Sequence, residues 1–213
     1  MDQRTDAAPP QLRPDQPLDL VVVGGGGHVG LPLTLAFAER GLCVGIVDIA
    51  EKTLDQIRGG HMPFMETGAE DLLRTILPTG RLVLSSDSRL LQQTRTIVVV
   101  IGTPIDEFMN PSTTIFERTI DDLAPNLVDG SLVVLRSTVY PGTTANVART
   151  LRDRGCEVDV AFCPERIAEG HALEELRALP QIIGADEDRA AERAAALFDH
   201  VIGRTIRTTA KEA

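Results

Sequence analysis

The sequence predicts an α/β fold with a doubly wound, mostly parallel sheet that is covered by helices on both faces. Short aliphatic runs alternate with segments of helical length along most of the 213 residues, a pattern typical of right-handed β–α–β crossovers. Hydrophobic residues make up 43% of the chain but aromatic residues only 3%. The core must therefore consist mainly of Val, Leu, Ile and Ala, which suits parallel strands that are buried on both faces.

The first strand and the glycine run behind it organise the rest of the chain. The aliphatic run Leu20–Val23 is followed by the spacing G-x-G-x-x-G at Gly25, Gly27 and Gly30, and then by an apolar segment at Leu31–Arg40. A strand, a glycine turn and a helix in that order predict a Rossmann-like dinucleotide-binding unit. In this interpretation Gly25 permits the turn, Gly27 lets a pyrophosphate approach the backbone, and Gly30 lets helix and strand pack closely. The alternative interpretation of the glycine run is a flexible loop.

The second strand ends on the acidic residue that such a unit needs. Val44–Val47 is followed by Asp48, about 20 residues after the glycines. A carboxylate at this position accepts hydrogen bonds from the ribose hydroxyls of NAD and repels the 2′-phosphate of NADP. The sequence therefore predicts NAD as the cofactor.

The remaining strands and helices continue the alternation. We expect helices at Glu51–Arg58, Ala69–Leu77, Ile115–Leu127, Thr144–Arg154 and Glu187–His200, and strands at Leu82–Ser85, Ile97–Ile101, Leu132–Leu135, Val158–Phe162, Gln181–Gly184 and around Ile206. Polar residues follow three of these strands, at Gly102-Thr103-Pro104, Ser137-Thr138 and Pro164-Glu165. Because ligands of such sheets bind at the carboxyl ends of the strands, we expect these three segments to line one crevice with the glycine loop.

Composition and charge limit the remaining possibilities. Residues 1–17 contain four prolines and several charges, so we expect a disordered lead-in there. We expect the NAD-binding domain to span residues 18–207. The formal charge of −10 argues against nucleic acid and against an anionic membrane surface as partners. Cys43, Cys156 and Cys163 show neither paired nor metal-ligand spacing, which predicts buried thiols in a reducing cytoplasm and no metal site.

Longer strings give the chain a family resemblance. They are Gly25–Leu33, Val47-Asp48, Gly102-Thr103-Pro104, Ser137–Thr144 and Cys163–Gly170, followed by Glu174-Glu175-Leu176 and Pro180–Gly184. From about Leu18 to the C-terminus the sequence resembles the UDP-glucose/GDP-mannose dehydrogenase family. The pair Arg166-Ile167 behind the glutamate resembles the branch that acts on UDP-N-acetylmannosamine.

The resemblance implies an enzyme of polysaccharide biosynthesis that oxidises the 6-hydroxymethyl group of a UDP-sugar to a carboxylate in two NAD-dependent steps. In that family the second oxidation uses a nucleophilic cysteine, a lysine and asparagine of a central helix also take part, and a C-terminal domain binds UDP. No cysteine here matches the nucleophile, and residues 208–213 resemble the start of the central helix. We therefore expect the 213-residue chain to be inactive by itself, and the full-length form to be a homodimer that assembles through the central helix.

The resemblance also assigns roles to single residues. Thr138 and Glu165 correspond to a polar pair near the reacting carbon, which orients a water and assists proton transfer, and Glu169 to a second acidic position there. Arg166 is expected to contact the substrate, or else to pair with Glu169 or Glu174. Residues expected to contact the cofactor are Gly25, Gly27, His28, Val29, Gly30, Asp48, Thr103, Pro104 and Thr138.

Two other interpretations of the chain stay open. One is another two-domain NAD dehydrogenase, of the hydroxyacid or 6-phosphogluconate type, in which the Pro164–Ile167 string is not expected. The other is a free-standing NAD-binding or regulatory module without chemistry of its own.

Overall fold

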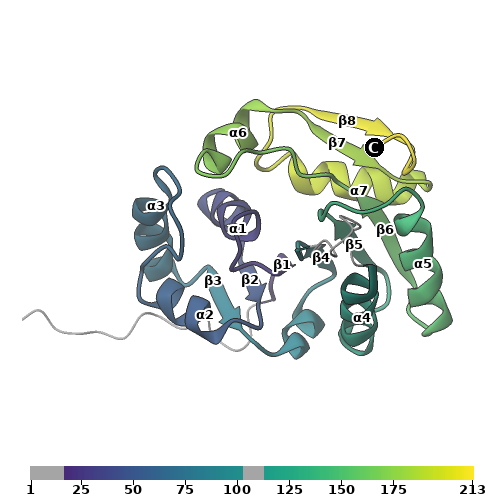
Figure 1. Ribbon diagram of the computed structural model, residues 1–213, viewed down its shortest axis with the longest axis horizontal. Coiled ribbons are helices and arrows are strands. Elements are labelled where there is room, and N and C mark those ends of the chain that lie inside the picture. Colours follow the sequence, from purple (N-terminus) through teal and green to yellow (C-terminus); the bar gives the residue numbers. More distant parts are fainter. Residues whose placement is uncertain (1–16, 103–112) are drawn as a thin grey trace, which may run out of the picture.

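A sheet of eight strands runs through the computed structural model, which describes residues 17–102 and 113–213 (Figure 1). The order across the sheet is β3-β2-β1-β4-β5-β6-β7-β8. The strands are β1 (Leu20–Val23), β2 (Val44–Val47), β3 (Leu82–Ser85), β4 (Thr96–Val99), β5 (Ser131–Leu135), β6 (Val158–Phe162), β7 (Gln181–Gly184) and β8 (Thr205–Thr208). The strands expected from the sequence are therefore present, with small shifts at their ends.

The strand order changes direction at β1, which lies between β2 and β4. Val22 pairs in parallel with Ile46 on one side and with Val98 on the other. Every neighbouring pair is parallel except β6 and β7, which run antiparallel. This is the doubly wound, mostly parallel fold that the sequence predicts. A crevice forms in such a sheet where the order reverses, so the carboxyl end of β1 is the expected ligand position.

Each central strand sends alternate side chains into two separate cores. Leu20 and Val22 of β1 belong to one core and Val21 to the other. The first core is closed by α1 (Gly30–Glu39), α2 (Glu51–Arg58), α3 (Ala69–Ile76), α6 (Ala172–Ala178) and α7 (Asp188–Phe198). The second is closed by α4 (Thr113–Leu123), α5 (Thr143–Asp153) and the 3-10 helix η2 (Ser88–Gln93). Figure 1 shows α1 and α7 on one side of the sheet and α4 on the other.

Two helices were not expected from the sequence. Helix α6 has seven residues, too few for a periodic pattern, and it buries Ala172, Leu173 and Leu176. Segment η2 begins at Asp87, whose carboxylate accepts a hydrogen bond from the Arg89 amide. Both are short segments whose apolar residues become buried only through packing against other parts of the fold.

Two other helices pass into a 3-10 helix that contains a proline, before the residue at which we expected them to end. Helix α4 ends at Leu123, and the chain continues as η3 (Ala124–Asn126), because Pro125 has no amide hydrogen for an α-helical bond. Helix α3 likewise passes into η1 (Leu77–Thr79), which contains Pro78.

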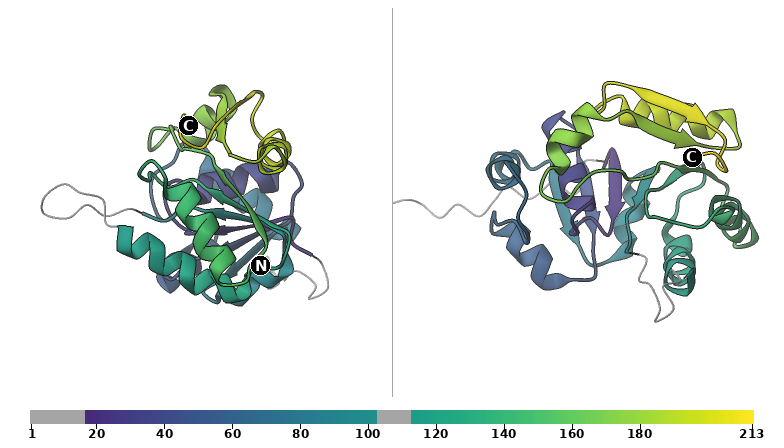
Figure 2. Two further views of the ribbon diagram at one scale, coloured as in Figure 1. Left: turned by 90° about the vertical axis from the view of Figure 1, so that its right-hand side faces the viewer. Right: turned by 45° about the horizontal axis from the view of Figure 1, so that its top comes forward.

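The C-terminal elements gather on one side of the molecule (Figure 2). Strand β8 includes Thr208, one residue beyond the boundary that the sequence suggested. After it, the Glu212 carboxylate accepts hydrogen bonds from the amide and hydroxyl of Thr209, and the Ala213 amide donates to the Thr209 carbonyl. Residues 210–212 form a turn. The expected lead-in at residues 1–17 lies outside the described residues except for Pro17.

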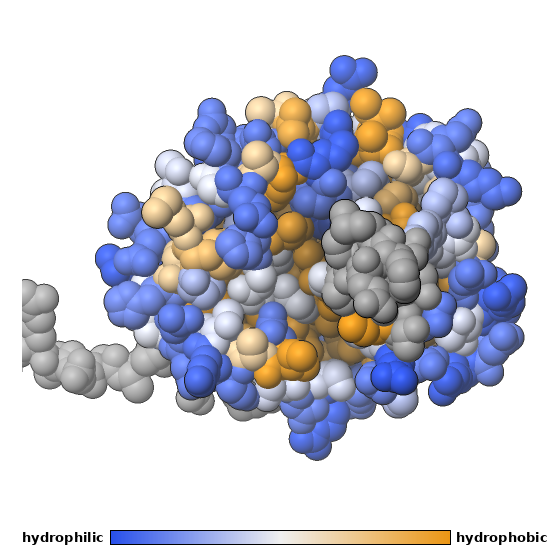
Figure 3. All heavy atoms as spheres, in the orientation of Figure 1, coloured by the Kyte–Doolittle hydropathy of each residue, from blue (hydrophilic) through white to orange (hydrophobic). Residues whose placement is uncertain are grey.

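The helices of the described residues are all too short or too polar to cross a membrane. On the face shown in Figure 3, hydrophilic residues dominate the rim and hydrophobic ones gather toward the middle. The middle of this face is therefore a candidate ligand site.

Candidate functional site

The glycine loop between β1 and α1 is packed so tightly that most of its glycines are required by the fold. Gly24 has φ +77°, and a Cβ there would lie 2.0 Å from the Val100 carbonyl oxygen. A Cβ on Gly30 would lie 2.5 Å from the Gly24 carbonyl oxygen. The left-handed residue of the turn is thus Gly24, whereas the sequence analysis assigned the turn to Gly25. Gly25 is needed for a different reason, since its Cβ would lie 2.9 Å from the Ile46 side chain.

Gly27 is the exception in this loop. A Cβ there would meet only the Gly24 carbonyl oxygen, at 3.6 Å, which is an ordinary contact. The fold therefore tolerates a side chain at Gly27, which is exposed. Next to it, the amides of His28 and Val29 donate to no acceptor among the described residues. Free amides at a helix start suit an anionic group, and the missing side chain lets that group approach the backbone.

Asp48 lies beside this loop at the carboxyl end of β2. Its Oδ2 accepts a hydrogen bond from the Gly26 amide at 2.9 Å, and its Oδ1 accepts one from the Ala50 amide at 3.0 Å. Each carboxylate oxygen has a second lone pair, so the half-buried side chain can still accept hydrogen bonds from a diol. The aliphatic Ile49, which the sequence analysis did not single out, follows with 93% exposure. Such a residue presents a flat apolar surface next to the carboxylate.

A hollow lies at the carboxyl ends of β5 and β6. It has a volume of about 420 Å³ and is lined by Ser137, Thr138, Val139, Tyr140, Pro141, Thr144, Phe162, Pro164, Glu165 and Ala210–Ala213. Thr138 is exposed, whereas Ser137 is buried and its Oγ accepts a hydrogen bond from the Ile101 amide at 2.9 Å. The fold thus brings Thr138 and Glu165 to one cavity. No residue of the glycine loop lines it, although the sequence predicted one crevice for all of these segments.

Glu165 is held in place by a buried arginine that the sequence analysis did not identify. The carboxylate Oε2 forms an ion pair with Arg136, whose side chain is 2% exposed against 12% for Glu165. The other oxygen accepts hydrogen bonds from the Arg166 and Ile167 amides at 2.7 and 2.9 Å. Arg136 also donates to Gln181 Oε1 at 2.7 Å. Glu165 is therefore a largely buried and paired carboxylate, not a solvated one.

The other two charged candidates, Arg166 and Glu169, do not line this hollow. The Arg166 guanidinium donates to the Pro180 carbonyl, so it forms neither of the expected ion pairs, with Glu169 or with Glu174. Glu169 is exposed and makes no hydrogen bond within the described part of the chain. Thr103 and Pro104, which were expected to contact the cofactor, lie outside the described residues.

The cysteines are poor nucleophiles in this environment. Complete burial raises the pKa of Cys163 to about 12, although the nearby Arg136 charge acts in the opposite direction. Burial also raises the pKa values of Cys43 and Cys156. All three thiols are free, and within residues 17–102 and 113–213 no group of His, Cys, Asp and Glu could hold a metal ion.

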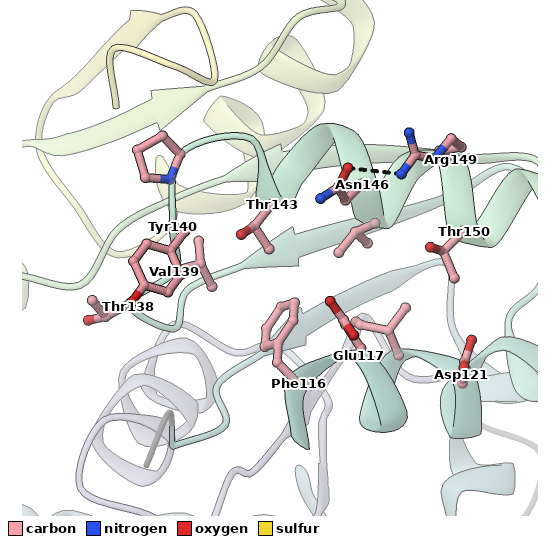
Figure 4. Close-up of a pocket in the computed structure, with 13 residues that line it drawn as sticks. Phe116, Glu117, Asp121, Thr138, Val139, Tyr140, Thr143, Asn146, Arg149 and Thr150 are labelled. Carbon is pink, nitrogen blue, oxygen red and sulfur yellow. Dashed lines mark hydrogen bonds between the residues drawn. The ribbon is translucent and has the colours of Figure 1, made fainter. Parts of the chain in front are cut away.

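A further hollow separates α4 from α5 (Figure 4). It has a volume of about 310 Å³ and an apolar floor that includes Phe116, Ile120 and Val147. On its rim, Arg149 donates a hydrogen bond to Asn146 Oδ1 at 3.1 Å. Its lining includes Thr138–Pro141 as well as residues of the two helices, so Thr138 borders both this hollow and the one beside Glu165.

Comparison with known proteins agrees with this geometry. Residues 19–202 match the model of the UDP-glucose/GDP-mannose dehydrogenase family, NAD binding domain. The UDP-N-acetyl-D-mannosamine dehydrogenase of Pyrococcus horikoshii is 31% identical over 91% of this chain and 47% of its own length. An NDP-N-acetyl-D-galactosaminuronic acid dehydrogenase of Ralstonia solanacearum is also 31% identical, over 91% of this chain and 48% of its own.

Solved structures give the same result. The P. horikoshii UDP-D-ManNAc dehydrogenase superposes with a TM-score of 0.86 at 30% identity, covering 92% of this chain and 48% of that one. A UDP-glucose dehydrogenase of Pyrobaculum islandicum gives 0.85 at 28% identity, over 94% and 48%. This chain thus spans about half the length of the relatives it matches. It belongs to the UDP-glucose/GDP-mannose dehydrogenase family of NAD-dependent enzymes and comprises the NAD-binding domain of that family.

Proposed function

We propose that this chain is the NAD-binding part of a UDP-sugar 6-dehydrogenase that converts UDP-N-acetylmannosamine to the corresponding uronate by two successive oxidations. The observation that carries the proposal is that residue 27 is a glycine although the fold would tolerate a side chain at this position. The choice of sugar rests on the names of several relatives and on the Arg166-Ile167 pair.

In this proposal the glycine loop binds the pyrophosphate of NAD. The amides of His28 and Val29 donate to its oxygens, and Asp48 accepts the adenosine ribose hydroxyls. Gly27 leaves the backbone open to the pyrophosphate, whereas Gly25 permits the turn and Gly30 the close packing of helix and strand. The carboxylate of Asp48 also repels the 2′-phosphate of NADP. Thr103, Pro104 and Thr138 complete the cofactor contacts in this scheme. Bound NAD would supply the hydride acceptor for both oxidations.

On the substrate side, we assign roles to Glu165, Thr138, Glu169 and Arg166. The ion pair with Arg136 and the two backbone amides fix the carboxylate of Glu165 in one orientation. From there it orients a water molecule, together with the exposed Thr138 hydroxyl, and takes up its proton. Glu169 and Arg166 are assigned to the outer part of the same site, where Arg166 meets the substrate. A positioned base and hydroxyl reduce the entropy cost of bringing water to the reacting carbon.

The whole protein has further proposed properties. Residues 18–207 form the NAD-binding domain and residues 208–213 begin a central helix, through which two copies associate. The enzyme would act in the cytoplasm, on the route to a polysaccharide.

Calorimetry on the 213-residue chain tests the cofactor assignment. We expect NAD to bind more tightly than NADP, and Asp48→Asn to narrow the gap, because a neutral amide does not repel the 2′-phosphate. Asp71→Asn, an exposed change on α3, is the matched control and should leave the gap unchanged. With NAD and UDP-N-acetylmannosamine the chain alone should form no NADH. Equal affinities for NAD and NADP in the unaltered chain would contradict the role of Asp48.

A further inference from the structure

His28 occupies a defined position although its side chain is exposed. It lies in the glycine loop one residue after Gly27 and stacks on Phe64, with ring centroids 4.0 Å apart and an angle of 25° between the planes. Phe64 comes from the loop between α2 and α3, which is distant from the glycine loop in sequence. Stacking of this kind restricts the rotamers of the imidazole before any ligand is present.

The loop that carries Phe64 is itself anchored. Glu66 is buried, and its carboxylate accepts hydrogen bonds from the Gly170 amide at 3.1 Å and the Leu173 amide at 3.3 Å. Two residues before Phe64, the Met62 amide donates to Glu70 Oε2 at 3.2 Å. Both sides of Phe64 are thus tied to helical segments, so the imidazole rests on a fixed surface.

His28 is also the only residue between Gly24 and Gly30 that can carry a positive charge. The charged or titratable groups on the neighbouring segments include Asp48, Glu51, Lys52, His61, Glu66 and Glu70. Asp48 accepts hydrogen bonds from two amides, Glu66 likewise, and Glu70 pairs with Arg74. In a chain with a formal charge of −10, one additional cation at this loop matters for an anionic ligand.

We propose that His28, held in place by Phe64, contacts the pyrophosphate of NAD and that its protonated form strengthens cofactor binding. The proposal rests on the assignment of the glycine loop to the pyrophosphate. A protonated imidazole donates from both ring nitrogens, and such charge-assisted bonds to phosphate oxygens are stronger than neutral ones. As a residue type, histidine changes charge between about pH 5 and 8, where NAD stays an anion at its pyrophosphate.

The test is the NAD affinity of the 213-residue chain, measured by calorimetry at pH 8 and pH 5.5. We expect the unaltered chain to bind NAD about fivefold more tightly at the lower pH. His28→Phe keeps an aromatic stack on Phe64 but removes the charge, and its affinity should be the same at both pH values. ADP-ribose, which retains the pyrophosphate, should behave like NAD, whereas adenosine should show no pH effect.

Two further variants separate a local effect from a general one. His61→Gln removes an exposed histidine from the neighbouring loop and should leave the pH effect intact. Phe64→Leu removes the stack but not the charge, and should reduce the pH effect. A pH effect that persists in His28→Phe, or that also appears with adenosine, would overturn the proposal, as would its absence from the unaltered chain. A chain that binds no NAD at either pH would instead contradict the proposed function.

Discussion

The two ligand-facing corners of this sheet are built in different ways. The glycine loop after β1 is shaped by close approach to its backbone, both within the loop, where Gly30 meets Gly24, and from the segment after β4, where Val100 meets Gly24. The corner formed by β5 and β6 is shaped by side chains from distant segments. Arg136, directly after β5, donates a hydrogen bond to Gln181, 45 residues away, and its guanidinium lies 5.2 Å from the centre of the Phe198 ring. A site of the first kind can be recognised in a sequence, whereas a site of the second kind becomes visible only in the fold.

The two corners also differ in what stabilises them. Around the glycine loop, the ion pairs of Arg58 and Arg74 are largely exposed, and such pairs contribute little. The Arg136–Glu165 pair is buried, and the Arg136 Nε has no acceptor among the described residues. A buried pair gains little over an apolar core, but losing one partner leaves an uncompensated charge. We therefore expect the second corner to be more sensitive to changes of charge than to changes of backbone shape.

The sharpest test places the same methyl group at two glycines of the first corner. Gly24→Ala would put a Cβ 2.0 Å from the Val100 carbonyl oxygen at a positive φ, so we expect a loss of about 4 kcal/mol in the free energy of unfolding, measured with urea. Gly27→Ala meets only a contact at 3.6 Å and should leave stability unchanged. Its effect should instead appear in NAD affinity, as a loss of more than about tenfold, or about 1.4 kcal/mol.

Two outcomes would contradict this separation of roles. If Gly27→Ala destabilised the fold as much as Gly24→Ala, the loop would be a structural turn throughout. If Gly27→Ala bound NAD normally, the pyrophosphate would not approach the backbone there.

A smaller loss is expected from the second corner. Arg136→Met leaves the Glu165 carboxylate without its ion pair in a position that is 12% exposed, which should cost about 3 kcal/mol of unfolding free energy. Adding Glu165→Gln should restore part of this loss, since the unpaired charge is then gone. NAD affinity should change little in either variant, because the glycine loop does not depend on this pair.

The urea midpoints of the single and double variants give the coupling energy of the pair. Losses that simply add would show that Arg136 and Glu165 do not interact. A large loss of NAD affinity in Arg136→Met would show that the two corners are not independent.

The sequence predicted the strands, the glycine turn after β1, the position of Asp48 at the end of β2, and that Thr138 and Glu165 line one cavity. Each of these features depends on a local pattern of apolar residues, glycines and strand ends. It did not predict that Arg136 would be buried, since an arginine at a strand end is normally solvated and its partners come from the loop after β6 and from β7. The stack of His28 on Phe64 was not predicted either, because the two residues lie in loops that are distant in the sequence. Helix α6 was not predicted because it becomes buried by packing against α1, and its own seven residues contain no pattern that indicates this contact.

The smallest effect concerns a second long-range ion cluster in the same half of the molecule. The Asp159 side chain on β6 is 1% exposed and accepts hydrogen bonds from Arg189 at 2.6 Å and Arg193 at 2.7 Å, both on α7. Burial raises the pKa of Asp159, but the hydrogen bonds and charges of the two arginines outweigh it and hold the pKa below its ordinary value of 3.8. A lowered pKa contributes stability that is present above the ordinary value and is lost as the pH falls through the folded-state pKa.

Asp159→Asn should therefore cost about 1.5 kcal/mol of unfolding free energy at pH 7, and the difference from the unaltered chain should shrink below about pH 4. Urea midpoints at pH 7, 4 and 3 measure this, with Asp55→Asn as the control, since Asp55 forms only an exposed pair with Arg58. The control should stay within about 0.5 kcal/mol of the unaltered chain at every pH. A difference for Asp159→Asn that stayed constant down to pH 3 would mean that the cluster acts through packing and not through charge. The second half of the sheet would then be stabilised in the same way as the first.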